Sequence, residues 1–159
     1  MIPMTLADIA AAVDGTLLGA DPDATVTGGV EFDSRKVGPG GLFAAFDGEK
    51  VDGHEYAETA VKQGAVAVLA SRTVDAPSIM VDDVRAAMGR LATAVLRRLP
   101  DLTVIGLTGS SGKTTTKDLL AGLLSGLGPT VATAGSFNNE LGLPHTVLRV
   151  TAETRYLVL

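Results

Sequence analysis

The chain contains no cysteine, few aromatic residues and no long hydrophobic run. Cysteine is absent from its 159 residues and aromatic residues make up 4%. Without cysteine there is no disulfide, zinc–thiolate site or cysteine nucleophile, which fits a reducing compartment. No apolar run approaches the ~20 residues that a membrane helix needs. The first residues also lack the basic and apolar regions of a signal peptide. We therefore expect a cytoplasmic protein with an aliphatic core and no membrane insertion.

Positive charge is also scarce. The chain has 13 Lys and Arg against 18 Asp and Glu, which gives a formal net charge of −5. An acidic chain without a basic stripe is a poor candidate for nucleic-acid binding. Any anionic ligand must therefore be bound by a local motif such as a P-loop. Hydrophobic residues make up 46% of the chain, which is ample for packed cores.

Residues 103–127 read as a strand, a glycine-rich loop and a helix. Residues 103–107 are apolar and β-branched, which is typical of a buried strand. Residues 113–127 carry leucines on one helical face, which we expect to be core. The loop between them reads Gly-Ser-Ser-Gly-Lys-Thr-Thr from Gly109 to Thr115. Glycines let backbone N–H groups surround phosphate oxygens, and the helix dipole adds positive potential.

We predict that this loop binds the phosphates of ATP. Lys113 would reach the β- and γ-phosphates and the Thr114 hydroxyl would ligate Mg²⁺, so we assign these two residues catalytic roles. The general pattern expects glycine at the position of Leu107, and a chance glycine–serine loop before a helix is the alternative. We expect Lys117 and Asp118 on a solvated face of the helix. The full set of predicted ATP contacts is Gly109, Ser110, Ser111, Gly112, Lys113, Thr114 and Thr115.

Short strands and helices alternate along the rest of the chain, which predicts an α/β protein. We place a small N-terminal domain at residues 1–82 and the first part of a P-loop domain, Rossmann-like with a mainly parallel sheet, at residues 83–159. We expect Thr5 and the pair at residues 82–83 to cap helices, residues 25–32 to form one strand, and residues 146–150 to be helical. The last predicted strand, 154–159, is not followed by the acidic residue that completes the Mg²⁺ site of P-loop proteins. We therefore expect a truncated chain, the front part of a longer protein.

A polar turn and two histidines could be functional or could be ordinary structural features. The turn from Asp33 to Lys36 could be an ordinary polar turn, because Asp and Ser are common turn formers. We expect His54 to lie at a helix start or on the surface. His145 follows Pro144 and has no evident carboxylate partner, so we give it no role.

Three spaced motifs resemble the Mur ligases of bacterial cell-wall synthesis. The loop matches their pattern Gly-x-Thr-Gly-(Ser/Thr)-x-Gly-Lys-Thr-Thr, beginning at Gly106, in which the position of Leu107 is not a glycine. Residues 33–48, with Asp-Gly-His at 52–54, look like the UDP-binding domain shared by the members that add the third peptide residue and the terminal dipeptide. Residues 136–144 are similar to the members that add D-alanyl-D-alanine.

The resemblance implies an ATP- and Mg²⁺-dependent amide ligase that acts as a monomer. It would join D-Ala-D-Ala to UDP-MurNAc-tripeptide through an acyl phosphate, and this stretch alone would be inactive. The alternatives are a third-residue-adding ligase or an unrelated P-loop phosphotransferase or NTPase. Asn138 and Asn139 could also be ordinary turn residues. The implied contacts with the UDP-linked substrate are Phe32, Ser34, Glu49, Lys50, Val51, Asn138 and Asn139.

Overall fold

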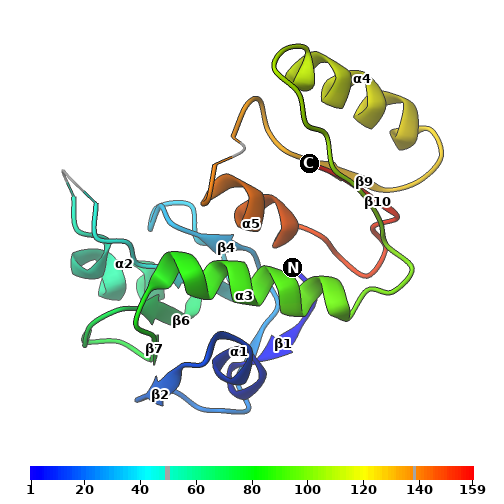
Figure 1. The fold of residues 1–159 in the computed structure, drawn as a ribbon. Coiled ribbons are helices and arrows are strands. Elements are labelled where there is room, and N and C mark those ends of the chain that lie inside the picture. The colour runs from blue at the N-terminus through cyan, green and yellow to red at the C-terminus, as the bar shows by residue number, and fades with distance from the viewer. Residues whose placement is uncertain (49–50, 138) are drawn as a thin grey trace.

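The computed structural model describes residues 1–48, 51–137 and 139–159, and it contains two mainly parallel sheets (Figure 1). The larger sheet has five strands, of which β2 is antiparallel to β7 and the other neighbours are parallel. This arrangement confirms the predicted α/β class. The strands lie in the order β2 (Thr16–Leu18), β7 (Ser78–Met80), β6 (Ala65–Ala70), β5 (Gly41–Ala44) and β4 (Val30–Glu31).

The smaller sheet is entirely parallel and has β10 at its centre. Helix α4 (Lys113–Ser125) packs against β9 and β10. Because parallel strands end at the same edge, the segments that follow all three strands meet there, and such edges hold ligands in α/β proteins. The strands lie in the order β8 (Thr103–Ile105), β10 (Tyr156–Val158) and β9 (Thr130–Ala132).

Helix α3 (Val84–Arg97) lies between α1 (Leu6–Val13) and α5 (Gly142–Val147) and packs against both (Figure 1). One core cluster, whose buried members are all Met, Ile, Leu, Val or Ala, runs from the N-terminal strands to α5 and β10, so the predicted aliphatic core is confirmed. The cluster includes residues on both sides of position 82. The remaining elements are β1 (Met4–Thr5), β3 (Thr25–Val26), the 3₁₀ helix η1 (Gly53–Tyr56) and α2 (Ala57–Lys62).

Both predicted helix caps are confirmed. The Thr5 hydroxyl accepts the Asp8 N–H at 3.1 Å and so begins α1. The Asp83 carboxylate accepts the N–H groups of Arg85 and Ala86 at 2.7 and 3.1 Å and so begins α3. These bonds satisfy N–H groups that have no partner inside the helix. In the part of the chain described here, every helix is too short or too polar to cross a bilayer.

Two predicted elements are wrong in their bounds. Residues 25–32 are not one strand: β3 pairs with β1, while β4 pairs with β5. The strand is interrupted between β3 and β4, where Gly28 lies against the backbone of Gly41. An added Cβ at Gly28 would be 2.8 Å from the Gly41 nitrogen. The last helix begins earlier than residue 146 and occupies Gly142–Val147.

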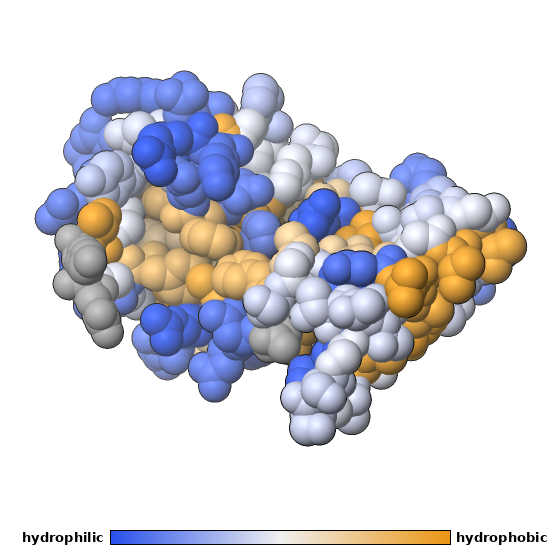
Figure 2. Space-filling model, turned by 90° about the horizontal axis from the view of Figure 1, so that it is seen from above, coloured by the Kyte–Doolittle hydropathy of each residue, from blue (hydrophilic) through white to orange (hydrophobic). Residues whose placement is uncertain are grey.

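The predicted burial is wrong for three of the five leucines in residues 113–127. Leu119, Leu123 and Leu127 are 66%, 74% and 65% exposed, and Figure 2 shows a hydrophobic strip over this helix. The physical reason is that α4 covers a sheet of only three strands, so Leu120 and Leu124 alone are half-buried. Lys117, which was expected in solvent, is instead buried.

Candidate functional site

The predicted phosphate-binding loop connects the carboxyl end of β8 to the first turn of α4. Gly109 and Gly112 have φ angles of 150° and 76°, a region that favours glycine because a Cβ is strained there. Gly112 is the N-cap of α4, and the Lys113 ammonium folds back to donate to the Gly109 carbonyl. The backbone N–H groups at this helix start are suited to bind an anion.

A cavity of about 500 Å³ lies beside this loop. Lys113 and Thr114 line the cavity, while the other five predicted ATP contacts are exposed on the loop and the helix start and are not part of its wall. The opposite wall comes from the segment that follows β9. The complete lining is Gly106, Leu107, Thr108, Lys113, Thr114, Lys117, Thr133, Gly135, Ser136, Leu143 and Leu159.

The cavity suits phosphate better than a metal held by protein side chains alone. Among the residues that the structure describes, no three His, Asp or Glu side chains are grouped so that they could hold a metal ion. Thr114, whose side chain carries a hydroxyl oxygen, is one of the residues that line the cavity. Mg²⁺ is commonly bound by one or two protein oxygens together with phosphate oxygens and water. The donor set therefore fits Mg²⁺ that arrives with a nucleotide.

A second cavity, of about 640 Å³, lies where β4 ends. The predicted UDP contacts Phe32, Ser34 and Val51 all line it, so the fold brings them together. Asn139 does not: its side-chain oxygen accepts the Gly142 N–H at 2.8 Å near the start of α5. Glu49, Lys50 and Asn138 lie outside the described residues. The other lining residues are Asp33, Arg35, Phe43, Phe46, Gly48, Gly53, Tyr56, Thr59, Arg85 and Leu141.

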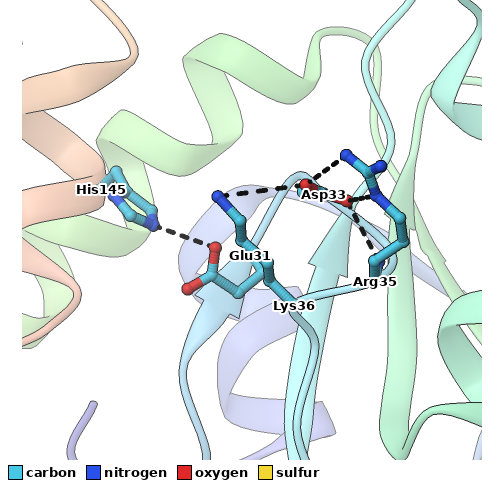
Figure 3. A network of polar contacts seen from close by, with 5 residues as sticks. All are labelled: Glu31, Asp33, Arg35, Lys36 and His145. Atoms are coloured by element: carbon cyan, nitrogen blue, oxygen red, sulfur yellow. Dashed lines mark hydrogen bonds and ion pairs between the residues drawn. The ribbon is translucent and has the colours of Figure 1, made fainter.

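The turn beside Ser34 is closed by a charged pair (Figure 3). The Arg35 guanidinium donates two hydrogen bonds of 2.9 Å to the Asp33 carboxylate, and the Lys36 ammonium is 4.0 Å from the same group. The hydrogen bonds from Arg35 lower the pKa of Asp33 to about 2. Asp33 is therefore ionised at neutral pH, and its charge is compensated at the rim of the cavity.

Phe32 connects the two halves of the structure. Its ring centroid is 6.3 Å from that of Phe46, 6.2 Å from that of Phe137 and 5.1 Å from that of His145. Phe32 also lines a third cavity, of about 300 Å³, together with Phe137 and His145. The ring is therefore shared between the 640 Å³ cavity and the segment that follows β9. Figure 2 shows the surface hollowed over this side of the molecule.

His145 lies near a carboxylate that the sequence did not indicate, although its Nε2 makes no hydrogen bond within the described part of the chain. Its Nε2 lies 3.5 Å from the Glu31 carboxylate, so α5 reaches across to β4 (Figure 3). The two residues are distant in sequence, and no local pattern connects them.

His54 was expected at a helix start or on the surface; it does lie in η1, but its side chain is buried. Its Nδ1 lies 2.7 Å from the Asp52 carboxylate, and its Nε2 accepts the Ser71 N–H at 3.1 Å. Asp52 also contacts the Arg72 guanidinium. These bonds fasten the turn beside Val51 to the end of β6, and so they hold one wall of the 640 Å³ cavity. The spacing Asp-Gly-His was visible in the sequence, but the partner in Ser71 was not.

The buried imidazole should make stability depend on pH. Burial lowers the pKa of His54 from its ordinary value of 6.5, and an Nε2 that accepts a hydrogen bond cannot carry a proton. The unfolded state therefore binds the proton more readily, and stability is lost as pH falls below 6.5. We expect the free energy of unfolding, measured by urea titration, to decrease between about pH 7 and about pH 5.

His54→Gln is the control, because it removes the titrating group while its amide oxygen can still accept the Ser71 N–H. We expect a flatter pH dependence for this variant. Parallel curves for the two proteins would contradict a neutral, buried His54.

Comparison with known proteins agrees with this arrangement. A model of the Mur ligase family, catalytic domain, matches residues 27–104, and a model of the Mur ligase middle domain matches residues 107–159. UDP-N-acetylmuramoyl-tripeptide–D-alanyl-D-alanine ligases from Mycobacterium tuberculosis and Escherichia coli are 50% and 44% identical over 100% of this chain. The chain spans only 36% and 35% of their lengths.

Solved structures give the same result. MurF from Acinetobacter baumannii superposes with a TM-score of 0.87 at 36% identity, over 99% of this chain and 35% of that one. The MurF ligase from Thermotoga maritima in complex with ADP superposes with a TM-score of 0.73 at 36% identity, over 84% and 32%. The two family models together match most of the chain, and the relatives align along its whole length. The chain therefore belongs to the Mur ligase family.

Proposed function

We propose that the whole protein containing this chain is an ATP-dependent ligase that joins D-alanyl-D-alanine to UDP-MurNAc-tripeptide. The observation that carries the proposal is the loop at the carboxyl edge of a parallel sheet, with Lys113 and Thr114 on the wall of a 500 Å³ cavity. The curated relatives named above bear this activity in their names. The structure from Thermotoga maritima, which contains ADP, supports the nucleotide assignment.

In this proposal, the backbone N–H groups between Gly109 and Thr115 surround the phosphates and Lys113 neutralises charge on the γ-phosphate. A peptide carboxylate oxygen attacks the γ-phosphorus, and the bond to ADP breaks as the new O–P bond forms. The amine of the dipeptide then attacks the acyl carbon and phosphate leaves. The Thr114 hydroxyl would supply one ligand to Mg²⁺, and the ion would compensate phosphate charge.

We further propose that the 640 Å³ cavity takes the uridine of the peptide substrate, against Phe32, Ser34 and Val51. Its aromatic walls suit a flat base, and the buried Ser34 hydroxyl offers a hydrogen bond. Contacts from Glu49, Lys50, Asn138 and Asn139 remain predictions, as does the domain boundary near residue 82. The protein would act in the cytoplasm as a monomer, without nucleic acid.

Calorimetry with UDP-MurNAc-tripeptide tests the uridine assignment on the chain itself. We expect binding, and we expect Ser34→Ala to weaken it by about five- to ten-fold, because one buried hydrogen bond is lost. Ser125→Ala, at the far end of α4, is the matched control and should bind as the wild type does. No heat at millimolar ligand would reject the assignment.

A further inference from the structure

Lys117 lies on the phosphate-binding helix, but its bonds lead away from the phosphate loop. We propose that Lys117 is a positioning residue for the UDP-linked substrate and not a nucleotide contact. This inference rests on the proposed function and adds a residue that determines how the peptide substrate is held.

The Lys117 ammonium is buried and bonded to two acceptors of the protein. The residue is 6% exposed, and its Nζ donates to the Thr133 carbonyl at 2.6 Å and to the Asp118 carboxylate. Burying a charge is costly unless it is paired and hydrogen-bonded, so these partners fix the side chain in place. Thr133 is buried too, and its N–H donates to the Val158 carbonyl at 3.1 Å. The ammonium therefore ties α4 to the residue that directly follows β9.

The segment that begins at Thr133 leads to the uridine side of the molecule. Within it, the Phe137 ring is 6.2 Å from the Phe32 ring and 6.4 Å from the His145 ring, measured between centroids. Phe32 lines the cavity that we assign to uridine. Residues 133–137 thus span the distance from Lys117 to the wall of the substrate cavity.

Lys117 and Thr133 both line the 500 Å³ cavity, but the Lys117 ammonium is bonded to the Thr133 carbonyl and the Asp118 carboxylate and not to the phosphate loop. Lys117 follows Lys113 by four residues, which is about 6 Å along the axis of an α-helix and away from the N-terminal amides. Its charge is already compensated by Asp118. Removing the ammonium would leave the buried Thr133 carbonyl without its donor, and the segment carrying Phe137 would be free to shift.

The test is a comparison of steady-state kinetics in the full-length protein. We expect Lys117→Met to raise the KM for UDP-MurNAc-tripeptide by about ten-fold while the KM for ATP stays within about two-fold. Lys117→Arg, which keeps a charged donor, should recover most of the affinity for the peptide substrate. Lys62→Met, on the exposed face of α2, is the matched control and should resemble the wild type.

Two outcomes contradict the role of Lys117: an unchanged KM for the peptide substrate, or an equal rise in the KM for ATP. If thermal melting shows that Lys117→Met does not fold, Lys117→Gln keeps an N–H donor for Thr133 and should raise the KM for the peptide substrate less than ten-fold. A Gln variant whose KM for ATP rises as much as its KM for the peptide substrate would also overturn the inference. Failure of the wild type to bind the peptide substrate would contradict the proposed function itself, whereas normal wild-type binding isolates the role of Lys117.

Discussion

Lys113→Ala in the full-length protein is expected to slow phosphate release by about 100- to 1,000-fold, or about 3–4 kcal/mol of transition-state stabilisation. Lys113 is the first residue of α4 and lines the 500 Å³ cavity. Its ammonium donates to the Gly109 carbonyl inside the loop, from which it can move to a γ-phosphate oxygen. Charge developing on that phosphate would lose its nearest cation. The measurement is phosphate released at saturating concentrations of all three substrates.

The loss should be catalytic and not a failure to fold. Lys113 is only half-buried and its side chain supports no core contact, so the melting temperature should change little. Lys113→Arg keeps the charge but not the compact ammonium, and should recover part of the rate. An unchanged rate for the alanine variant would remove Lys113 from the mechanism.

Gly142→Ala is expected to destabilise the 159-residue chain by about 3 kcal/mol or more. A Cβ at this position would lie 2.0 Å from the Phe137 carbonyl oxygen and 2.6 Å from its carbon. Both are backbone atoms, so the contact cannot be relieved by a side-chain rotation. The N–H of Gly142 also binds the Asn139 side chain, and a shift would break that bond. Denaturant unfolding followed by circular dichroism measures the effect.

The same substitution in α3 should have the opposite sign. A Cβ at Gly89 would meet no heavy atom within 4 Å among the described residues, apart from its chain neighbours and the backbone of its own helix turns. Alanine is favoured over glycine in a helix interior by about 1 kcal/mol, so Gly89→Ala should stabilise the protein slightly. Equal, small effects at the two positions would show that the approach of Gly142 to Phe137 is not as close as described.

The features that the sequence predicts well are those set by neighbours along the chain. Thr5 and Asp83 cap helices because their side chains reach N–H groups two or three residues ahead. The loop before α4 needs glycine at residues 109 and 112 for its backbone angles, and this need is visible in the sequence. The strand–loop–helix order of a phosphate site follows from the same local rules.

The features that the sequence does not predict depend on the order of the strands and on which elements cover each face of a helix or sheet. His54 meets Ser71, and Lys117 meets Thr133, only because a helix packs beside the end of a strand that is distant in sequence. Helical periodicity indicates that residues 119–127 have an apolar face, but it does not indicate how wide a sheet lies beneath it. For that reason Leu123 was expected in the core and lies in solvent.

Tyr56 lines the 640 Å³ cavity and is 41% exposed, in a chain that has no tryptophan and only two tyrosines. The other, Tyr156, lies in β10 with the Arg155 guanidinium 5.8 Å from its ring centroid. The intrinsic fluorescence of the 159-residue chain therefore comes from two phenols, of which one lines the cavity. In the proposed complex, a uracil ring beside Tyr56 would lower the emission of that phenol without any label, so this chain carries its own optical reporter for the proposed ligand.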